Sequence, residues 1–382
     1  MTNPSDNCEA RMIRWFCLLS VLSVVMAASA SAFAADSTVT PGISWSGLID
    51  VYYSGNLNDS SNQMNQMRNF DVYDNQFGLS LAKITLQKQA QPVGVRIDMA
   101  FGTTNDLVQG IAPFGTNSYS TLSNLEQAYL TFILPFGSGL TVDLGKFVTH
   151  MGYEVIESNG NWNYSRSFLF AYAIPFYHTG MRLTYSFVGN FTATLDILNG
   201  WNEVADNNKS KTLGFTLNYA PDAATDIVLN GISGFEQTTI GVPGPVMYGK
   251  KNVLDFYVTR EIGPRLALAV DADYGEERVT GFLNTWKGVA IYAKYSITGV
   301  SDLAARCEVY YDPNDYTTGA AFPNATFKEI TLTYEYNLFT DLVLVGEFRD
   351  DFANGPMFVS AGSKSPSDTS QPTLLVAAVV TF

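Results

Sequence analysis

The connections between candidate strands alternate in length along this chain. About sixteen short segments alternate apolar and polar residues, and every second link between them is tight, as at Gln89–Pro92, Val188–Asn190 and Leu338–Asp341. The other links are long, as at Ser54–Asn75 and Thr103–Asn124. A soluble sandwich has no reason to keep this asymmetry, whereas outer-membrane barrels have short turns on one side and long loops on the other. The pattern favours an all-β fold, an antiparallel up-and-down transmembrane β-barrel.

Strict period-2 alternation supports this fold, most clearly in the segment that begins at Val93. Its apolar side chains share one face, and Arg96 and Asp98 lie on the other face with small residues. In a narrow soluble barrel these charges would require costly burial and pairing. In a wide membrane barrel they face water, and the apolar face meets lipid.

We expect strands of about ten residues, which at ~3.3 Å per residue and a tilt of ~45° cover roughly 23 Å, close to the apolar band of such barrels. An even number of strands puts both termini on the periplasmic side, and sixteen leave an aqueous channel. The apolar phase of the second strand shifts between Leu81 and Ile84, which indicates a β-bulge. The expected strands begin near Ile43, Gln76, Val93, Leu125, Leu140, His178, Phe191, Thr212, Asp226, Asn252, Arg265, Trp286, Leu303, Thr326, Leu342 and Pro372.

The N-terminal segment predicts export. The apolar run Trp15–Ala28 follows Arg11 and Arg14 and leads into Ser31-Ala32-Phe33-Ala34, the pattern of a cleaved secretory signal. We therefore expect residues 1–34 to be a signal peptide and residues 35–382 to form a single barrel domain in the outer membrane of a Gram-negative bacterium. An uncleaved anchor is the alternative.

Composition and motifs exclude several classes of function. The net charge of −14 argues against a nucleic-acid partner, whose phosphates require clustered Lys and Arg, and it biases a pore toward cations. Cys307 is the only cysteine after the signal, so no disulfide or cysteine metal site can form. A hydrolase or metal site would have to use His150 and His178, but H-E-x-x-H and G-x-S-x-G are absent. We expect no enzyme activity, no cofactor and no metal centre.

The last strand, Pro372–Phe382, alternates apolar residues and ends in an aromatic side chain. Such an end resembles the signal read by the barrel-assembly machinery, and pairing with the first strand would remove both sheet edges. The expected partners are this machinery, outer-membrane lipid and small hydrophilic solutes. A homotrimer and a monomer are both compatible with the sequence, because lipid-facing and subunit-facing strands are equally apolar.

Aromatic residues lie near strand ends on the apolar face. Their amphipathic rings suit the lipid–water boundary, so we expect them to form the two girdles of the barrel. These residues are Trp45, Tyr53, Phe101, Phe187, Tyr219, Tyr274, Trp286, Tyr311 and Phe382.

The longest connection, His150–Tyr177, is richer in aromatic residues than an exposed loop requires, so we expect it to pack against another part of the chain. It is the third long loop, which in general porins folds into the lumen and sets the constriction. Opposed charges across a narrow pore filter solutes by size and sign. The candidate pore-lining residues are Arg96, Asp98, Lys146, Glu154, Glu157, Arg166 and Arg182. Capping of the barrel or bracing of a trimer contact is the alternative role.

Four motifs resemble one family. They are FDVYDNQFGL at 70–79, GKFVTH at 145–150, EVIE at 154–157, and the segment from NWNYSRS at 161–167 to PFYHTG at 175–180. They resemble the beta-barrel porin-2, OmpL-like family, and the resemblance covers nearly the whole chain after the signal. It implies an outer-membrane barrel assigned as a porin and carries over no catalytic or ligand-binding residues.

The expected function is passive diffusion of small hydrophilic solutes and ions through a water-filled lumen, with no cofactor. The alternative is a plugged barrel whose loops serve a structural or surface-interaction role.

Overall fold

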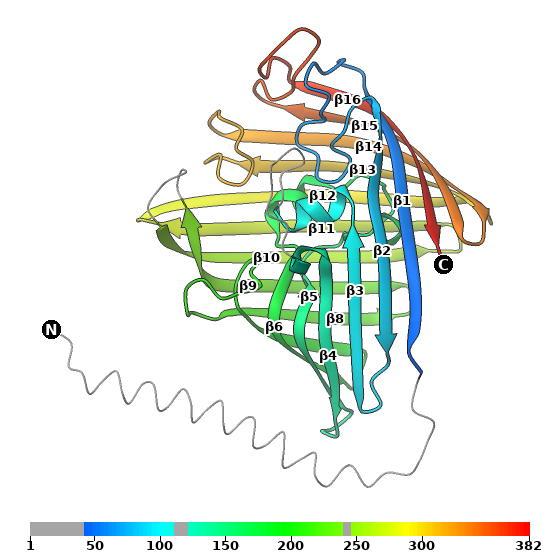
Figure 1. Cartoon of the computed structure of the whole chain (residues 1–382), viewed down its shortest axis with the longest axis vertical. Coiled ribbons are helices and arrows are strands. Elements are labelled where there is room, and N and C mark those ends of the chain that lie inside the picture. The colour runs from blue at the N-terminus through cyan, green and yellow to red at the C-terminus, as the bar shows by residue number, and fades with distance from the viewer. Residues whose placement is uncertain (1–41, 111–120, 240–245) are drawn as a thin grey trace, which may run out of the picture.

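The computed structural model describes residues 42–110, 121–239 and 246–382, so the expected signal peptide lies outside the described residues. Sixteen antiparallel strands close into one barrel in chain order, as predicted (Figure 1). The strands are β1 (Ser44–Asn56), β2 (Gln76–Lys88), β3 (Val93–Phe101), β4 (Leu125–Leu134), β5 (Leu140–Val148), β6 (Tyr177–Phe187), β7 (Phe191–Leu198), β8 (Thr212–Asp222), β9 (Thr225–Thr239), β10 (Val246–Ile262), β11 (Leu266–Val279), β12 (Phe282–Thr298), β13 (Ser301–Asp312), β14 (Ala325–Phe339), β15 (Leu342–Ala353) and β16 (Ser370–Thr381). The helical segments are α2 (Thr103–Val108), η1 (Thr121–Asn124), η2 (Ser158–Gly160) and η3 (Leu169–Ala173). Within the described ranges, no helix is long and apolar enough to cross a membrane.

The barrel closes where β1 pairs with β16, as the last strand predicted. The Gly47 N–H donates to the Phe382 carbonyl at 2.7 Å, and the Phe382 N–H donates back to the Gly47 carbonyl at 3.0 Å. A Cβ atom at Gly47 would lie 2.2 Å from the Phe382 ring. Glycine at this position therefore makes room for the terminal aromatic side chain at the seam.

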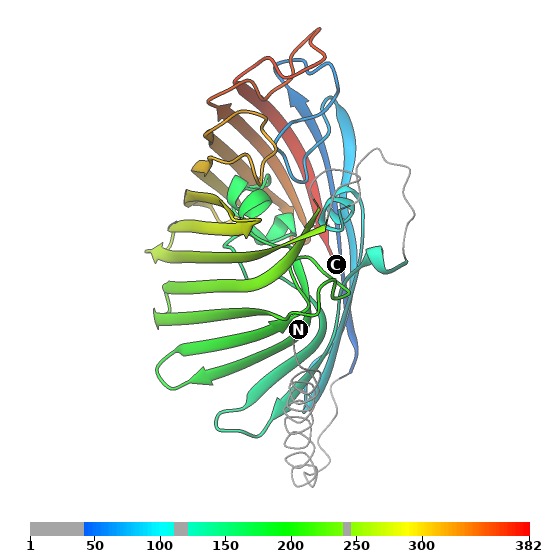
Figure 2. The same ribbon diagram turned by 90° about the vertical axis from the view of Figure 1, so that its left-hand side faces the viewer.

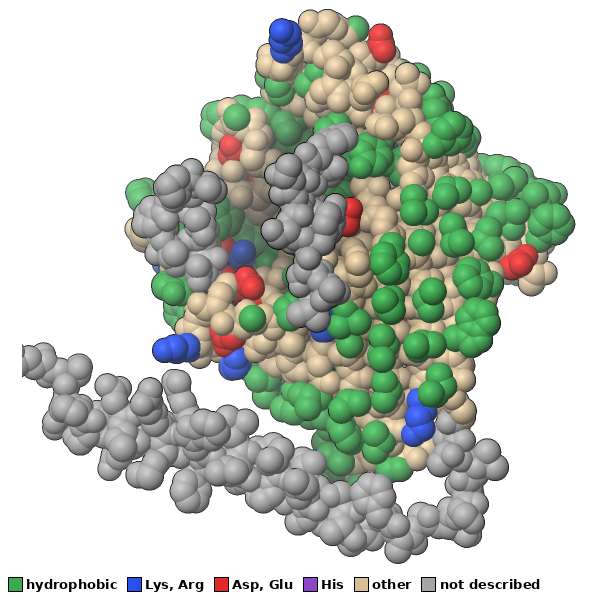
Figure 3. Space-filling model, viewed as in Figure 1, with side chains coloured by type: hydrophobic (Ala, Val, Ile, Leu, Met, Phe, Trp, Pro, Cys, Tyr) green, Lys and Arg blue, Asp and Glu red, His purple; other side chains and the backbone are tan. Residues whose placement is uncertain are grey.

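The wall has an apolar outer face and a polar inner face, because successive side chains of a strand point to opposite sides. On β14, Ile330 and Leu332 are exposed on the outside, whereas Thr331 and Thr333 are fully buried on the inside. Rows of hydrophobic side chains cover the outer surface over β1–β3 (Figure 3). The wall thus reverses the arrangement of a soluble protein, as the alternation predicted.

The long and short connections lie at opposite ends of the barrel. The short turns, such as 89–92, 188–190 and 340–341, share one end with the start of β1 and the end of β16. We call this the short-turn end and the opposite end the long-loop end. The link between β11 and β12 departs from the pattern, because it lies at the long-loop end yet contains only residues 280–281.

Two strands extend further than predicted. β10 begins at Val246 rather than near Asn252, and β12 begins at Phe282 rather than near Trp286. Their added residues contain like neighbours, Lys250-Lys251 and Phe282-Leu283, which interrupt the period-2 pattern. The bulge predicted in β2 is present, and the register passes over Ser80, just before the predicted interval.

The prediction that Trp286 belongs to an outer girdle is wrong. Its side chain is 1% exposed, and its Nε1–H donates to the Ala173 carbonyl inside the barrel at 3.1 Å. Gly275 lies opposite Trp286 in the sheet, and a Cβ atom there would lie 2.0 Å from the indole. The indole occupies the space that a side chain at 275 would fill. Trp45, Phe101, Phe187, Tyr219, Tyr274 and Phe382 are exposed on the outer face, as predicted.

Candidate functional site

Residues 149–176, between β5 and β6, fold into the interior of the barrel, and we call them loop 3. In two perpendicular views the loop and its segment η3 lie between β1–β3 on one side and β10–β13 on the other (Figure 1, Figure 2). The aromatic content of the loop predicted packing, and this is confirmed. Phe168 and Leu169 are fully buried, in one apolar cluster with Trp286, Tyr310 and Phe327 of the wall.

Carboxylates and arginines on β13–β15 bind the loop. The Glu308 carboxylate accepts the N–H groups of Phe168 and Leu169, both at 2.7 Å. The Glu347 carboxylate accepts the Tyr164 N–H at 2.7 Å. The Arg306 Nη1 atom lies 2.7 Å from the Glu154 Oε1 atom. Because buried charges are unfavourable unless they are paired and hydrogen-bonded, these contacts hold the loop in one position against the wall.

A second group of contacts joins the loop to β1–β4. The Asp50 carboxylate accepts hydrogen bonds from the Ser158 hydroxyl and the Tyr164 hydroxyl, both at 2.7 Å. Lys83 forms ion pairs with Asp98, Glu126 and Glu157. Glu157 belongs to the loop and the other two carboxylates belong to the wall. The Lys83 ammonium group therefore links loop 3 to β3 and β4.

The seven predicted pore-lining residues differ in exposure. Three have partly exposed side chains, namely Arg96 at 30%, Glu157 at 24% and Arg182 at 20%. The other four, Asp98, Lys146, Glu154 and Arg166, are buried.

The structure brings Arg96, Asp98 and Glu157 together around Lys83. The Arg96 Nη2 atom lies 2.9 Å from Asp98 Oδ2, and the Lys83 Nζ atom lies 3.1 Å from the same oxygen. Lys83, Arg96 and Glu157 also line one cavity of about 340 Å³ beside the β1–β16 seam. This is the place where predicted charges from the loop and the wall meet at an accessible surface, and we call it the Lys83 cluster.

Arg182 and Lys146 lie apart from the Lys83 cluster. The Arg182 Nε atom is 3.1 Å from Asp196 Oδ1, and the guanidinium lies 4.1 Å from the centre of the Phe147 ring. The Lys146 ammonium donates to the Leu125 carbonyl at 2.7 Å and lies 4.2 Å from the centre of the Tyr177 ring.

Arg166 is a contact within the loop rather than a charge facing open space. Its side chain donates to the carbonyls of Val155, Ile156 and Tyr164, and lies 5.1 Å from the centre of the Phe70 ring. The guanidinium therefore joins two parts of loop 3.

The sequence did not single out Lys83, Arg306, Glu308, Glu347 or Arg349 as site residues. Alternation placed Arg306 and Glu308 on a polar face, but their partners lie far away in the chain, as for Arg306 and Glu154. One signal in the sequence could have indicated them. Large charged residues such as Arg306 and Glu308 occur on the inner face of strands whose other inner-face residues are small.

The two histidine rings lie next to each other, with ring centres 5.7 Å apart and planes tilted by 38°. The His150 Nε2 atom lies 3.2 Å from the Gly231 carbonyl, and its Nδ1 atom lies 3.4 Å from Asp196 Oδ2. The nitrogens of His178 contact the Gly200 carbonyl and the Thr149 hydroxyl, each at 3.2 Å. These contacts use the ring nitrogens to fix the start of loop 3.

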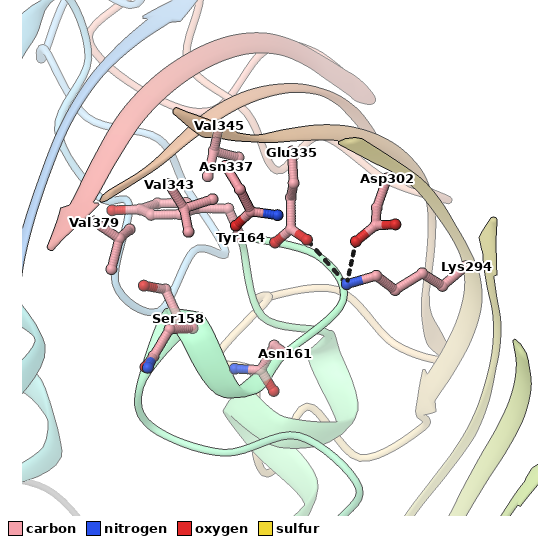
Figure 4. A pocket seen from close by; sticks show the side chains of 11 residues that line it. Ser158, Asn161, Tyr164, Lys294, Asp302, Glu335, Asn337, Val343, Val345 and Val379 are labelled. Atoms are coloured by element: carbon pink, nitrogen blue, oxygen red, sulfur yellow. Dashed lines mark hydrogen bonds and ion pairs between the residues drawn. The ribbon is translucent and has the colours of Figure 1, made fainter. Parts of the chain in front are cut away.

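A second cavity of about 220 Å³ lies between loop 3 and the wall near the short-turn end (Figure 4). Ser158 and Asn161 approach it from the loop. On the wall, the Lys294 Nζ atom lies 3.0 Å from Glu335 Oε2 and 3.3 Å from Asp302 Oδ2. The cavity is therefore polar and carries both signs of charge.

At the level of loop 3 the inner wall is covered all round. Each of the sixteen strands contributes at least one buried inner-face side chain. In strand order these include Asp50, Lys83, Asp98, Gln127, Phe147, His178, Asp196, Thr212, Asn230, Asp255, Asp271, Tyr292, Arg306, Thr331, Arg349 and Thr373.

Solved structures of outer-membrane proteins share this fold. OmpT of Vibrio cholerae is 11% identical, with a TM-score of 0.61 over 91% of this chain and 99% of that chain. An anion-selective porin from Comamonas acidovorans is 12% identical, with a TM-score of 0.59 over 89% and 99%. The outer membrane channel DcaP of Acinetobacter baumannii is 10% identical, with a TM-score of 0.57 over 91% and 99%. At these identities the likeness concerns the fold.

Comparison of sequences gives the family. No curated protein sequence matches the chain significantly. One family model matches residues 42–382, which is the whole barrel. The family expected from the motifs around loop 3 is therefore confirmed, and the chain belongs to the family described as "Putative beta-barrel porin-2, OmpL-like".

Proposed function

We propose that this protein is a diffusion porin of the outer membrane, in which small hydrophilic solutes and ions pass a constriction formed by loop 3. The observation that carries the proposal is the Lys83 cluster, where Glu157 of the loop meets Lys83 and Arg96 of the wall at a cavity of about 340 Å³. Opposed charges at a narrow place orient water and select solutes by size and sign. The net charge of −14 favours cations over anions as the permeating ions.

Single-channel recording in a planar bilayer under a salt gradient tests this function. The purified barrel should give discrete open steps with a measurable reversal potential. Arg96→Glu should move the reversal potential toward cations, because it replaces a positive charge at the constriction by a negative one. Open channels with an unchanged reversal potential would place the path away from the Lys83 cluster.

A closed barrel with a structural or surface-interaction role is the second candidate, and the complete ring of buried inner-face residues favours it. A variant in which residues 153–173 are replaced by a short Gly-Ser linker separates the two functions. If the whole protein stays silent and this variant conducts, loop 3 is a plug. If both conduct, with larger steps in the variant, loop 3 is a constriction.

Export and assembly complete the proposal. We infer that residues 1–34 direct secretion and that β16, ending at Phe382, is read by the barrel-assembly machinery. N-terminal sequencing of the membrane-inserted protein should find a start near Ala35. The mass of the detergent-solubilised barrel distinguishes a monomer from a homotrimer, a form in which OmpT of Vibrio cholerae has also been solved.

A further inference from the structure

Three aspartates on the inner wall lie together without a basic partner. Asp255 of β10 is opposite Asp273 of β11 in the register, and Asp271 follows on the same face of β11. One carboxylate oxygen from each lies within 4.8 Å of the others. The three side chains are 0%, 4% and 1% exposed, in that order.

The basic side chains that could balance these charges are paired elsewhere. On the same face of β10, the Lys251 Nζ atom lies 2.9 Å from Glu277. Arg306 binds Glu154 and Glu329. In the part of the chain that the structure describes, no ion pair includes any of the three aspartates. Three buried carboxylates this close repel one another strongly unless a cation binds between them or they share protons.

The Asp255 carboxyl group is hydrogen-bonded to those of Asp271 and Asp273, but several oxygens of the cluster accept no hydrogen bond from an N–H or hydroxyl group of the described residues. They are Asp255 Oδ2, Asp271 Oδ1 and both carboxylate oxygens of Asp273. The other oxygen of Asp255 accepts hydrogen bonds from the Asn230 amide and from the Gly152 N–H. Buried polar atoms almost always have hydrogen-bond partners, so a group of such oxygens on one face indicates a bound ligand.

Tyr292 provides an independent observation that points to the same space. Its side chain is 1% exposed, and its hydroxyl has no hydrogen-bond partner within the described ranges. Tyr292 is opposite Ala269, so it lies diagonally across from Asp271, and its hydroxyl interacts electrostatically with Glu154 and with Asp271. Gly288 and Ala290 stand opposite Asp273 and Asp271 on β12, and the Leu169 side chain of loop 3 packs over Gly288, where an added Cβ would lie 2.8 Å from it.

We propose that Asp255, Asp271, Asp273 and the Tyr292 hydroxyl bind a divalent cation, with Ca²⁺ as the preferred ion. Ca²⁺ takes six to eight oxygen ligands at about 2.3–2.6 Å, so two of its ligands lie at most about 5 Å apart. The 4.8 Å limit of the carboxylate oxygens fits this coordination sphere.

The cation would stabilise the folded position of loop 3. The Gly152 N–H donates to Asp255 at 3.2 Å, and the Tyr153 ring centre lies 4.8 Å from that of Tyr292. Both residues belong to the part of the loop that contacts β10–β12. Removal of the cation leaves the carboxylates to repel one another beneath this contact, so the loop should become more accessible.

Calcium binding to the EDTA-treated full-length barrel tests the proposal. Isothermal titration with Ca²⁺ should show one site, and Asp271→Asn with Asp273→Asn should weaken it about a hundredfold or more, since two of three charged ligands are removed. The matched control is Asp143→Asn with Asp226→Asn, which removes the same charge from inner-face positions that contact Thr131 and Asn218 instead. The control should bind Ca²⁺ as the unchanged protein does.

A second measurement uses the unchanged protein alone and so does not depend on the folding of a variant. Ca²⁺ should slow proteolytic cleavage within loop 3, and Tb³⁺ should luminesce on tyrosine excitation, because Tyr292 is a proposed ligand. Equal Ca²⁺ binding in the double variant would overturn the proposal. So would the absence of both a binding heat and Tb³⁺ luminescence, and that result would indicate carboxyl groups that share a proton instead.

Discussion

Burial determines what each charged side chain inside this barrel can do. Arg96 and Arg166 both have a guanidinium at the level of loop 3, yet the Arg96 side chain is 30% exposed and Arg166 is 4% exposed. Arg166 donates to three loop carbonyls, whereas Arg96 pairs with Asp98 beside a cavity. The first acts on the loop, and the second can act on a passing ion.

Arg166→Ala should loosen loop 3 without a direct effect on ion selectivity. Loss of the charged donor leaves buried carbonyls without partners and lowers the free energy of loop docking by roughly 3 kcal/mol. That corresponds to an increase of about a hundredfold in cleavage within the loop under limited proteolysis. Arg96→Ala is the matched control and should leave the cleavage rate unchanged. Equal cleavage of both variants would show that Arg166 does not hold the loop.

His150 gives the docked loop a dependence on pH. Burial lowers the pKa of its imidazole below the ordinary value. Below about pH 6.5 the unfolded chain therefore binds a proton that the folded chain does not, and stability falls as the pH falls. The urea midpoint of the refolded barrel should drop between pH 7 and pH 5, and by less in His150→Gln. An equal drop in both proteins would assign the dependence to other groups.

At the scale of elements, loop 3 is a folded unit with its own supports. Segment η3 begins where the Glu308 carboxylate accepts the N–H groups of Phe168 and Leu169. These two groups start a helical turn, whose first N–H groups lack partners within the helix. Glu308 on β13 thus accepts hydrogen bonds from the unpaired N–H groups at the start of η3, a segment of the loop that follows β5.

Glu308→Ala should release η3 while the strands stay paired. Two hydrogen bonds to a charged acceptor are lost, which weakens docking of the segment by roughly 3 kcal/mol. Amide hydrogen exchange should rise at residues 168–173 and stay unchanged in β13 and β14. Asp143→Asn, an inner-face change at a residue that bonds Thr131, is the control. Protection of η3 in the Glu308 variant would contradict this role.

The sequence was sufficient for the strands and insufficient for the contacts of the loop. Alternation indicates the two faces of a strand, so it located β1–β9, β11 and β13–β16 closely. It missed the first residues of β10 and β12, where two residues of the same kind are adjacent. Partners such as Glu154 and Arg306 are set by how the loop crosses the lumen, which no local pattern encodes. The exposure of charged residues inside the barrel likewise could not be predicted, so no feature of the sequence distinguished Arg166 from Arg96.

At the scale of the whole molecule, closure depends on one pair of strands. The seam between β1 and β16 combines the hydrogen bonds of Gly47 and Phe382 with an edge contact between the Trp45 and Phe382 rings, whose centres are 6.1 Å apart. A closed barrel has no free strand edge, so this seam completes the pairing of every strand.

Gly47→Ala should impair closure, because the added Cβ would lie 2.2 Å from the Phe382 ring and displace it. The fraction of heat-modifiable, folded barrel formed during refolding in detergent should fall, and formation should slow. Gly55→Ala on the same strand is the control, since nothing lies within 4 Å of its added Cβ. Equal yields from both variants would show that the terminal ring is dispensable at the seam.

Closure of the barrel by its first and last strands also determines the order in which the strands can pair. Synthesis proceeds from the N-terminus, so β1 emerges early and its partner, around Thr373–Thr381, is made only after the fourteen strands β2–β15. During that interval β1 has an unpaired edge, and pairing across such a sequence separation is intrinsically slow. The chain therefore needs protection from aggregation and proteolysis until β16 has paired with β1, and a chain truncated before β16 keeps the unpaired edge of β1.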